Sequence, residues 1–295
     1  MPTTIPTTTS STRPGSPSAG DAYFETDTNN YIIYDGANWR GYNNDAIFLD
    51  TVADTHSLLL DGTDDYLTTS HHFSDIFDGS FSISMWIKTP SSFTGRGSDD
   101  LMANYAGSLV TGKGYMEFRI VEVSSTTAKL IMYFEESYTG NFLDVSDIQT
   151  GAVLNNSSWH NIVFTADRPV SGTATPKIYV DGVSQTLTLA GGAFPLAGGT
   201  WDQNLYLGGR GGGSPIPFLG NMDNIALFDK TLIDKEVAAI YDAGGGGDLS
   251  QLDVQHWWKM EEGTGTTVAD SGGASTTYTA TFNSAPQWSS TVEPN

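Results

Sequence analysis

Alternating hydrophobic and polar residues recur through most of the chain after residue 56. In residues 80–89, SFSISMWIKT, apolar side chains occupy every second position at Phe81, Ile83, Met85 and Ile87. A period of two places them on one face of a β-strand. Residues 114–123 (GYMEFRIVEV) and 128–136 (AKLIMYFEE) repeat the pattern on either side of a short polar turn. The two segments therefore predict a hairpin.

Similar strands follow one another at short intervals, with glycine-rich connections. They are SLLLDGTDDYLTT (57–69), WHNIVFTAD (159–167), PKIYVDGVSQ (176–185), NLYLGG (204–209) and GNMDNIALFD (220–229). This spacing predicts an all-β fold of two packed sheets. Residues 232–244, LIDKEVAAIYDAG, are the one convincing helix, because Leu232, Val237, Ile240 and Tyr241 form an apolar stripe and Gly244 is a stop signal.

The first fifty residues have a different character. Residues 1–21 consist mostly of Thr, Ser and Pro, so we expect an extended or disordered arm unless another surface holds it. Residues 22–50 predict a small β module, which is marginal alone in water. Its aromatic side chains, which need a second surface, include Tyr23, Phe24, Tyr31, Tyr34 and Trp39. That surface is either the main domain, residues 51–295, or another protein, and the sequence slightly favours docking onto another protein.

Charge and composition narrow the classes of partner. Acidic residues outnumber basic ones by 34 to 13, which gives a net charge of −21. Such a surface repels nucleic acid and anionic membranes, and it leaves carboxylates that can bind Ca²⁺. The simpler interpretation of the charge is solubility. There is no cysteine, no secretory signal pattern and no apolar run of about 20 residues. We therefore expect synthesis in a bacterial cytoplasm without membrane insertion.

Sequence patterns for nucleophilic or zinc chemistry are missing. The chain has no cysteine and no Gly-x-Ser-x-Gly elbow. His71 and His72 point to opposite sides of an extended chain and cannot both bind one metal ion from a strand. We expect no enzymatic activity of these kinds.

The order of the strands resembles the laminin-G-like, concanavalin-A-like jelly roll. The matching strings are LLLDGTDDYLTT, FSISMWIKT, WHNIVFTAD, KIYVDGV and GNMDNIALFDKTLIDKEVAAIYDAG, over residues 57–244. The resemblance implies a two-sheet jelly-roll sandwich. Its glycosidase members use Glu-x-Asp-x-x-Glu, which this chain lacks; Glu117 and Glu135 are expected to pair with Arg119 and Lys129 instead.

Carbohydrate binding, common in this fold, needs aromatic platforms and polar partners. Candidates in the long loops are Tyr105, Tyr138 and Trp201 as platforms, with Asn141 and Arg210 as partners. The alternative is that Tyr138 and Trp201 cover core edges or an oligomer contact.

Laminin-G-like domains often hold one Ca²⁺ at the sandwich rim. LDGTDDY and GNMDN supply acidic and amide side chains of the appropriate type. The resemblance implies Asp61 and Asp223 as the ligands. The alternative is that both residues cap turns and accept backbone N–H bonds.

The segment HWWKMEEGTGTTVADSGG, from His256, resembles a stretch that precedes the DGTDDY strand in many members. Here it follows the helix. Either the domain is permuted, with residues 255–290 completing the sandwich, or a truncated second copy begins there; about forty residues are too few for a separate sandwich. We expect one of Trp257 and Trp258 to be buried and the other half covered.

RPGSPSAGDAYFETDTNNYIIYDGANW resembles a segment near the N-termini of bacteriophage tail-fibre-like and capsid-appendage proteins. This resemblance implies a virion surface protein, either a capsid decoration or a fibre-like appendage. Its N-terminal part would bind other virion proteins, and its jelly roll would bind host glycans. A homo-oligomer, for instance a trimer, is expected. The alternatives are a free lectin and a polysaccharide hydrolase.

Overall fold

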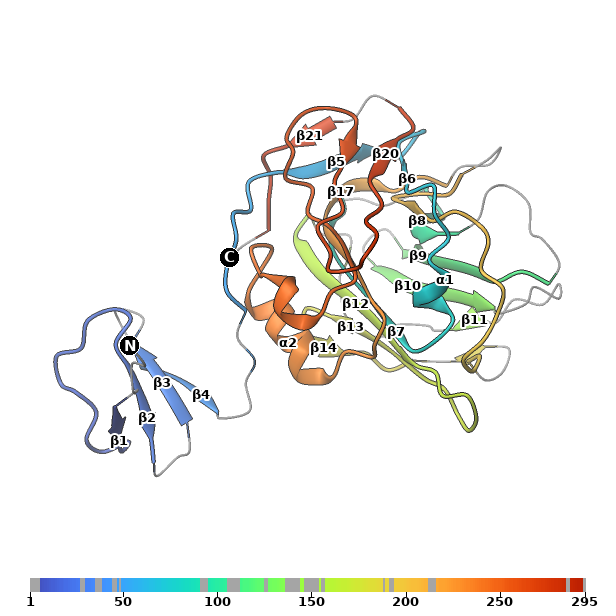
Figure 1. The fold of residues 1–295 in the computed structure, drawn as a ribbon. Helices are drawn as coiled ribbons and strands as arrows, with labels where there is room; N and C mark the ends of the chain where they lie inside the picture. Colours follow the sequence, from blue (N-terminus) through green and yellow to red (C-terminus); the bar gives the residue numbers. More distant parts are fainter. Residues whose placement is uncertain are drawn as a thin grey trace. The chain divides into compact units, whose positions relative to one another are not determined.

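The computed structural model contains two compact units, Met1–Phe48 and Leu49–Asn295 (Figure 1). The expected boundary between residues 50 and 51 lies two residues from the division in the structure. The structure describes residues 6–26, 30–34, 39–43, 47, 49–90, 95–104, 112–124, 127–135, 144–145, 154, 157–187, 189–190, 194–211, 216–284 and 287–293.

The first unit is a four-stranded sheet. Its strands, in spatial order, are β1 (Thr7–Thr8), β2 (Ala22–Glu25), β3 (Asn30–Tyr34) and β4 (Trp39–Asn43). Strands β2, β3 and β4 are antiparallel neighbours, whereas β1 pairs with β2 in parallel. Ile32 on β3 is fully buried.

Residues 6–21 are held against the strands of this unit by hydrogen bonds. The N–H of Phe24 donates to the carbonyl of Pro6 at 3.0 Å, and the N–H of Gly20 donates to Tyr34 at 2.8 Å. Arg13 pairs with Glu25, whose side chain is only 1% exposed. Backbone hydrogen bonds and a half-exposed ion pair therefore supply the holding surface without which the composition predicted an extended or disordered arm.

The aromatic side chains of this unit are partly described. Tyr23, Phe24 and Tyr34 are half-buried. The side chains of Tyr31 and Trp39 lie outside the described residues. Docking onto a partner protein therefore remains a prediction.

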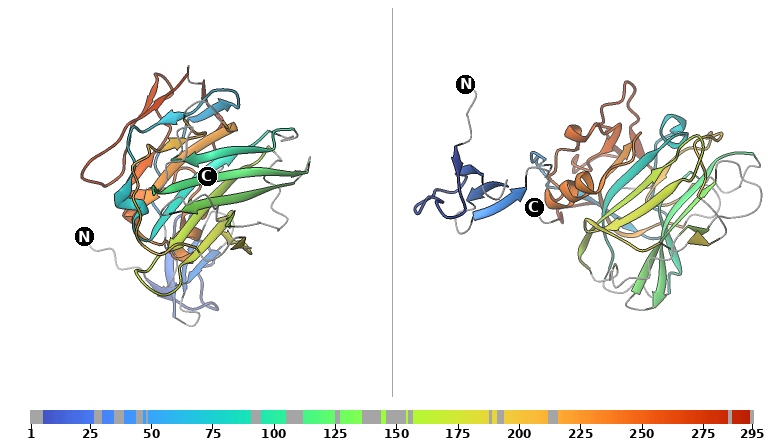
Figure 2. Two further views of the ribbon diagram at one scale, coloured as in Figure 1. Left: turned by 90° about the vertical axis from the view of Figure 1, so that its right-hand side faces the viewer. Right: turned by 90° about the horizontal axis from the view of Figure 1, so that it is seen from below.

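The second unit is an all-β sandwich of two large sheets, as predicted. The nine-stranded sheet runs in the order β15 (Leu189–Ala190), β11 (Asp144–Val145), β10 (Thr127–Glu135), β9 (Tyr115–Ser124), β8 (Ser98–Ala103), β16 (Tyr206–Leu207), β6 (Leu67–Thr68), β20 (Ala280–Phe282) and β19 (Thr267–Val268). The eight-stranded sheet runs in the order β14 (Val183–Ser184), β13 (Thr175–Val180), β12 (Trp159–Asp167), β7 (Phe81–Lys88), β17 (Leu219–Phe228), β5 (Ser57–Asp61) and β21 (Gln287–Ser289), with β18 (His256–Trp258) also paired to β17. Figure 2 shows β12 and β13 in one layer and β8, β9 and β10 in the other.

The core lies between the sheets, and the side chains at every second position of the strands fill it. Phe81, Ile83, Met85 and Ile87 of β7 are all fully buried, as the sequence predicted. The predicted hairpin is β9 and β10, which supplies the opposite wall with Met116, Phe118, Ile120, Leu130, Met132 and Phe134.

Among the described residues, three short helices accompany the sheets: α1 (Ser74–Phe77), α2 (Asp234–Asp242) and a 3₁₀ turn (Leu249–Leu252). Helix α2 buries Val237 and Ile240, while Tyr241 stacks on Trp86 of β7 at 6.0 Å between ring centroids. Since Trp86 points away from the core, α2 covers the outer face of the eight-stranded sheet (Figure 1). No helix in the described part of the chain is long and apolar enough to cross a membrane.

The segment after α2 contributes strands to both sheets. β18 pairs with β17 and β21 pairs with β5 in the eight-stranded sheet, whereas β20 pairs with β6 in the other. Trp257 and Trp258 are 1% and 0% exposed, so the expectation that one is half covered is wrong. Trp258 packs in the core, and Trp257, on the outer side, donates from Nε1 to Asn224 Oδ1 at 3.0 Å.

Candidate cation site and ligand-binding face

Three carboxylates from distant parts of the chain converge at one point in the second unit. Asp54 precedes β5, Asp223 lies in β17 and Glu293 follows β21. One oxygen from each lies within 4.8 Å of the others. Asp223 and Glu293 are 0% and 2% exposed, so the group is largely closed to solvent.

A bulge in β17 directs Asp223 into this cluster. The pairing of β17 with β7 shifts register between Asp223 and Ala226, and Asn224 has a positive φ of 46°. The backbone N–H of Asn224 donates to Asp223 Oδ1 at 2.8 Å, and its amide donates to the carbonyl of Gly245 at 2.9 Å. A β-bulge re-aims a side chain in this way without ending the strand.

The cluster brings three carboxyl groups together without a basic partner among the described residues. Asp223 Oδ2 and Glu293 Oε2 are buried and accept no hydrogen bond from the described residues. No ion pair in the described part of the chain joins a Lys or Arg to these groups. Burial, and next the charge of Glu261, raise the pKa of Asp54 to about 7. Burial, and next the charge of Asp54, raise the pKa of Glu293 to about 8. Burial, with the charges of Glu293 and Asp54, raises the pKa of Asp223 well above its ordinary value.

Gly245 leaves room for these side chains. A Cβ at this position would lie 2.2 Å from Glu293 Oε1 and 2.3 Å from Asp54 Oδ2. Hard divalent cations prefer carboxylate and carbonyl oxygens. The donor set therefore fits such an ion; a proton shared between carboxyl groups is the alternative occupant.

The structure does not bring Asp61 and Asp223 together. Asp61 pairs with Leu219 at the start of β17, in a separate group with Asp64 and Asp65. Its Oδ1 accepts the N–H of Thr63 at 2.7 Å, and Asp65 Oδ2 accepts the N–H of Asp61 at 3.0 Å. These bonds are those of turn caps. Sequence reasoning missed Asp54 and Glu293, because nothing local in the sequence marks either of them.

A second polar cluster occupies the outer face of the nine-stranded sheet. Asp100 on β8 lies opposite Arg119 on β9, and Arg119 Nε donates to Asp100 Oδ1 at 2.7 Å. Arg210 Nη1 binds Glu117 Oε1 at 2.7 Å, and its Nε lies 3.5 Å from Asp100 Oδ2. Arg119 also pairs with Glu117, as predicted. Two carboxylates and two guanidinium groups thus form one network.

Tyrosine rings border this network. The Arg119 guanidinium lies 5.1 Å above the ring of Tyr133, and Tyr66 and Tyr206 meet edge to face at 5.7 Å. Burial, and next the charge of Glu117, raise the pKa of Asp100 to about 7. The face therefore combines planar polar groups with half-buried aromatic rings.

The residues predicted to bind sugar are not all at this face. Trp201 is 3% exposed and its ring lies 4.7 Å from that of Phe134 in the core, so it cannot serve as a platform. Its alternative role, covering the core, is the one in the structure. Arg210 belongs to the ion-pair network. Tyr105, Tyr138 and Asn141 lie outside the described residues.

Comparison with known proteins identifies the family of the second unit. Residues 61–238 match a laminin-G model described as the concanavalin A-like lectin/glucanases superfamily. No curated protein matches the sequence.

Solved structures share the fold at low sequence identity. A Bacteroides ovatus protein named as a candidate carbohydrate-binding protein is 15% identical with a TM-score of 0.55, over 92% of this chain and 70% of that one. The CBM40 module of a Ruminococcus gnavus IT-sialidase is 16% identical with a TM-score of 0.45, over 66% and 98%. An SAP-like pentraxin from Limulus polyphemus is 12% identical with a TM-score of 0.44, over 66% and 86%. At 15% identity, the likeness to the Bacteroides ovatus protein shows the fold alone.

The buried carboxylates predict an unusual pH dependence in metal-free protein. Folded Asp54 and Glu293 have pKa values of about 7 and about 8, whereas the ordinary pKa values of 3.8 and 4.5 apply to the unfolded chain. Unfolding between these limits releases protons, so raising the pH lowers the free energy of unfolding. The free energy of unfolding can be measured by urea unfolding in EDTA at several pH values and plotted against pH. For Glu293→Gln this plot should fall less steeply than for the wild type, because up to about one proton fewer is released on unfolding.

The matched control for this measurement is Asp61→Asn in the exposed turn, which should keep the wild-type slope. If Glu293→Gln also keeps that slope, the folded carboxyl groups do not hold the extra protons.

Proposed function

Because the chain belongs to the concanavalin A-like lectin/glucanases superfamily, we propose that it is a non-catalytic carbohydrate-binding protein. The outer face of the nine-stranded sheet is the proposed sugar site. The observation that carries this proposal is the network of Asp100, Glu117, Arg119 and Arg210 beside tyrosine rings. The name of the Bacteroides ovatus protein is consistent with it.

The chemistry of this face suits sugar hydroxyls. Guanidinium groups donate hydrogen bonds, carboxylates accept them, and aromatic rings pack against the apolar faces of sugar rings. Arg119 is 17% and Arg210 14% exposed at the side chain, so both reach the surface while their partners Asp100 and Glu117 stay buried. A network held by mutual ion pairs keeps these groups in one geometry before a ligand arrives, which reduces the entropy cost of binding.

Hydrolysis is the second candidate activity, because Asp100 has a raised pKa beside a second carboxylate. A retaining glycosidase needs one carboxylic acid and one nucleophilic carboxylate about 5–5.5 Å apart. Here both carboxylates are bound by arginines, and that favours recognition over catalysis.

Binding to bacterial surface polysaccharides tests the sugar proposal, with affinity electrophoresis as the measurement. Tyr206→Ala removes a ring, and Arg210→Lys keeps the charge but loses the planar fork of donors. For the polysaccharide that retards the wild type, each variant should be retarded less, with a dissociation constant higher by about tenfold or more. Tyr241→Ala, on helix α2 over the opposite sheet, should bind as the wild type does.

Two results would contradict this proposal. One is binding that both variants leave unchanged. The other is release of new reducing ends by the wild type but not by Asp100→Asn, which would establish the hydrolase instead.

We also propose that residues 1–48 attach the protein to a bacteriophage virion, with the jelly roll displayed on the surface. The support is the resemblance of residues 13–39 to phage appendage segments, together with the separate compactness of this unit. Other virion proteins of head or tail are the proposed partners, and a homo-oligomer such as a trimer is the proposed assembly.

Deletion of residues 1–48 tests attachment. The remaining chain should keep the thermal unfolding midpoint of the second unit, because that unit has its own core. It should be absent from sedimented particles that contain the full-length protein, as measured by immunoblot. Incorporation of the truncated chain, or its failure to fold, would count against an anchoring role.

We further propose that Asp54, Asp223 and Glu293 hold a Ca²⁺ ion. Three carboxylates offer up to six oxygens, within the six to eight that Ca²⁺ takes. The ion would compensate buried charge that no basic side chain of the described residues neutralises. It would also tie the beginning and end of the second unit to β17.

The thermal unfolding midpoint with EDTA or excess Ca²⁺ measures this binding. Ca²⁺ at about 100 times its dissociation constant adds about 2.7 kcal/mol to the free energy of unfolding, so the midpoint should rise by several degrees. Asp223→Asn should lose the increment, and Asp61→Asn should retain it. Equal unfolding midpoints in EDTA and in Ca²⁺ would mean that the cluster holds protons and no Ca²⁺ ion. If only Asp61→Asn lost the increase, the ion would bind at Asp61, Asp64 and Asp65 instead.

A further inference from the structure

A strained turn carries two adjacent histidines between β6 and α1. Ser70 and Phe73 both adopt left-handed backbone conformations, with φ of 54° and 49°. Such conformations are unfavourable for residues other than glycine, and they persist only where the surrounding structure holds them. Residues 70–73, here called the histidine turn, are therefore held in place by contacts with other segments.

Aromatic rings make these contacts. The ring of His71 stacks on that of Tyr278, with 3.7 Å between centroids and 9° between planes, and His72 stacks on His71 at 4.6 Å. Phe73 is fully buried and meets the rings of His256 and Tyr278 edge to face, at 4.7 and 5.3 Å. Since Tyr278 precedes β20, this group of rings joins the C-terminal strands to the beginning of the sandwich.

Tyr278 is the fixed side of this contact. Its N–H donates to Asp270 Oδ2 at 2.9 Å, and its carbonyl accepts from the indole of Trp258 at 2.8 Å. Asp270 Oδ2 also lies 2.7 Å from His256 Nδ1, and its other oxygen accepts the N–H of Trp257 at 2.9 Å. The Asp270 carboxylate is therefore fully used by its own segment and cannot neutralise a charge on the histidine turn.

A proton on His71 has little compensation in this environment. The titratable and charged groups around the turn are His72, Asp75 of α1, His256 of β18, Asp270 and Tyr278 of the C-terminal segment, and Asp202, which faces His72 and pairs with Lys113. Burial, and next the charge of His72, lower the pKa of His71, while Asp75 opposes them. The closed turn therefore favours a neutral His71.

This preference makes the contact depend on pH with a definite sign. A released turn would have the ordinary histidine pKa of 6.5, whereas the closed turn has a lower pKa. Well above pH 6.5 both forms are neutral, and the contact keeps its full strength. As the pH falls below that value, only the released turn gains a proton. Opening is then favoured by up to about tenfold per pH unit, until the lowered pKa is reached.

We propose that the histidine turn is a pH-sensitive latch, which is closed while His71 is neutral and released when His71 gains a proton. Release separates the turn from Tyr278 and weakens the attachment of the C-terminal strands. That attachment is short, because β20 pairs with β6 through two residue pairs. The latch involves no sugar and no metal ion, so its test is independent of the functions proposed above.

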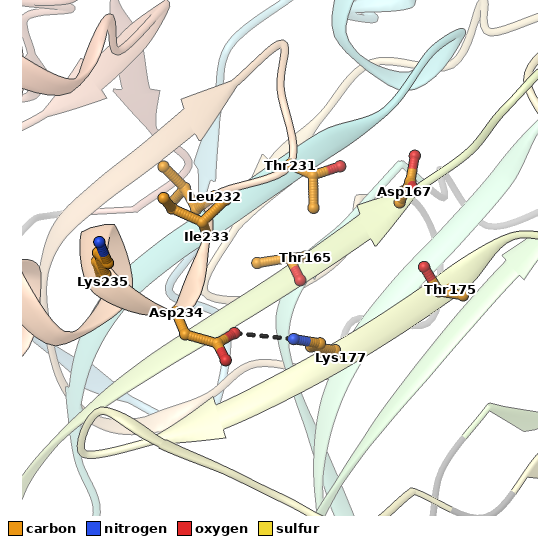
Figure 3. A pocket seen from close by; sticks show the side chains of 9 residues that line it. All are labelled: Thr165, Asp167, Thr175, Lys177, Thr231, Leu232, Ile233, Asp234 and Lys235. Carbon is orange, nitrogen blue, oxygen red and sulfur yellow. Dashed lines mark hydrogen bonds and ion pairs between the residues drawn. The ribbon is translucent and has the colours of Figure 1, made fainter.

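The start of α2 provides a reference whose charges do not change in this pH range. It borders a groove lined by β12, β13 and the connection from β17 to α2, where Lys177 Nζ lies 2.8 Å from Asp234 Oδ1 (Figure 3). This hydrogen bond is the main cause that lowers the pKa of Asp234 and raises the pKa of Lys177. Both groups therefore stay charged between mildly acidic and neutral pH.

Amide hydrogen exchange of the full chain, measured by NMR at about pH 7.5 and about pH 5.5, tests the latch. Protection factors correct for the intrinsic pH dependence of exchange. In acid, protection should fall by up to about tenfold at Leu205 and Ile76, whose N–H groups donate to the carbonyls of His71 and Phe73. Protection should not fall at Val237 in the first turn of α2.

Three variants identify the sensor. His71→Phe keeps a ring on Tyr278 but cannot take up a proton, so protection at Leu205 should be equal at the two pH values. Tyr278→Ala removes the stacking partner, so Leu205 should already exchange faster than in the wild type at neutral pH. His160→Gln on β12 is the matched control and should keep the wild-type pH dependence.

The latch is overturned if wild-type protection at Leu205 and Ile76 is equal at the two pH values, or if His71→Phe shows the wild-type fall. An equal fall at Val237 would mean that the whole unit unfolds in acid, which also contradicts it. NMR titration of the His71 ring in the wild type needs no variant. A pKa at or above 6.5 would contradict the proposal as well.

Discussion

The left-handed turn at Asn224, inside the central strand β17, is the constraint on which the second unit depends most. There the main chain breaks register with β7, and one side chain makes contacts with three separate segments. Asn224 donates to the carbonyl of Gly245 after α2, approaches Glu293 at 3.4 Å, and accepts from the indole of Trp257. A regular strand would direct these groups elsewhere, so the bulge joins the helix, the last strands and the carboxylate cluster into one arrangement.

In the part of the chain that the structure describes, the two outer faces of the sandwich differ because a helix covers only one of them. On the eight-stranded sheet, α2 and its flanking segments bury Trp86 and leave the groove at their edge. On the nine-stranded sheet, the charged side chains of β8 and β9 are compensated by one another and not by a helix. A buried charge is tolerated only when it is paired or hydrogen-bonded.

Hydrogen bonding distinguishes the buried ionisable groups that serve the fold from those that are candidates for binding a ligand. Arg168 is 2% exposed, yet it donates to the carbonyls of Gly79, Pro195 and Gly198 and lies 4.7 Å above the Phe134 ring. Its hydrogen-bonding capacity is used by the fold. The carboxylates of Asp223 and Glu293 each keep an oxygen without a hydrogen-bond donor, which is costly in a folded protein. That contrast is why the acidic cluster suggests a cation.

The sequence by itself determined the strands, the hairpin, the helix and the two-sheet class, because periods of two and 3.6 residues follow from local geometry. The packing of Phe81, Ile83, Met85 and Ile87 was predictable for this reason. Only the tertiary structure decided which distant residues meet. Asp54 and Glu293 are far apart in the chain, and they lie together because β5 and β21 pair. For Trp201 in a glycine-rich loop, the sequence left a sugar platform and a cover for the core both open. The fold places the ring in the core, and local sequence does not specify what a loop covers.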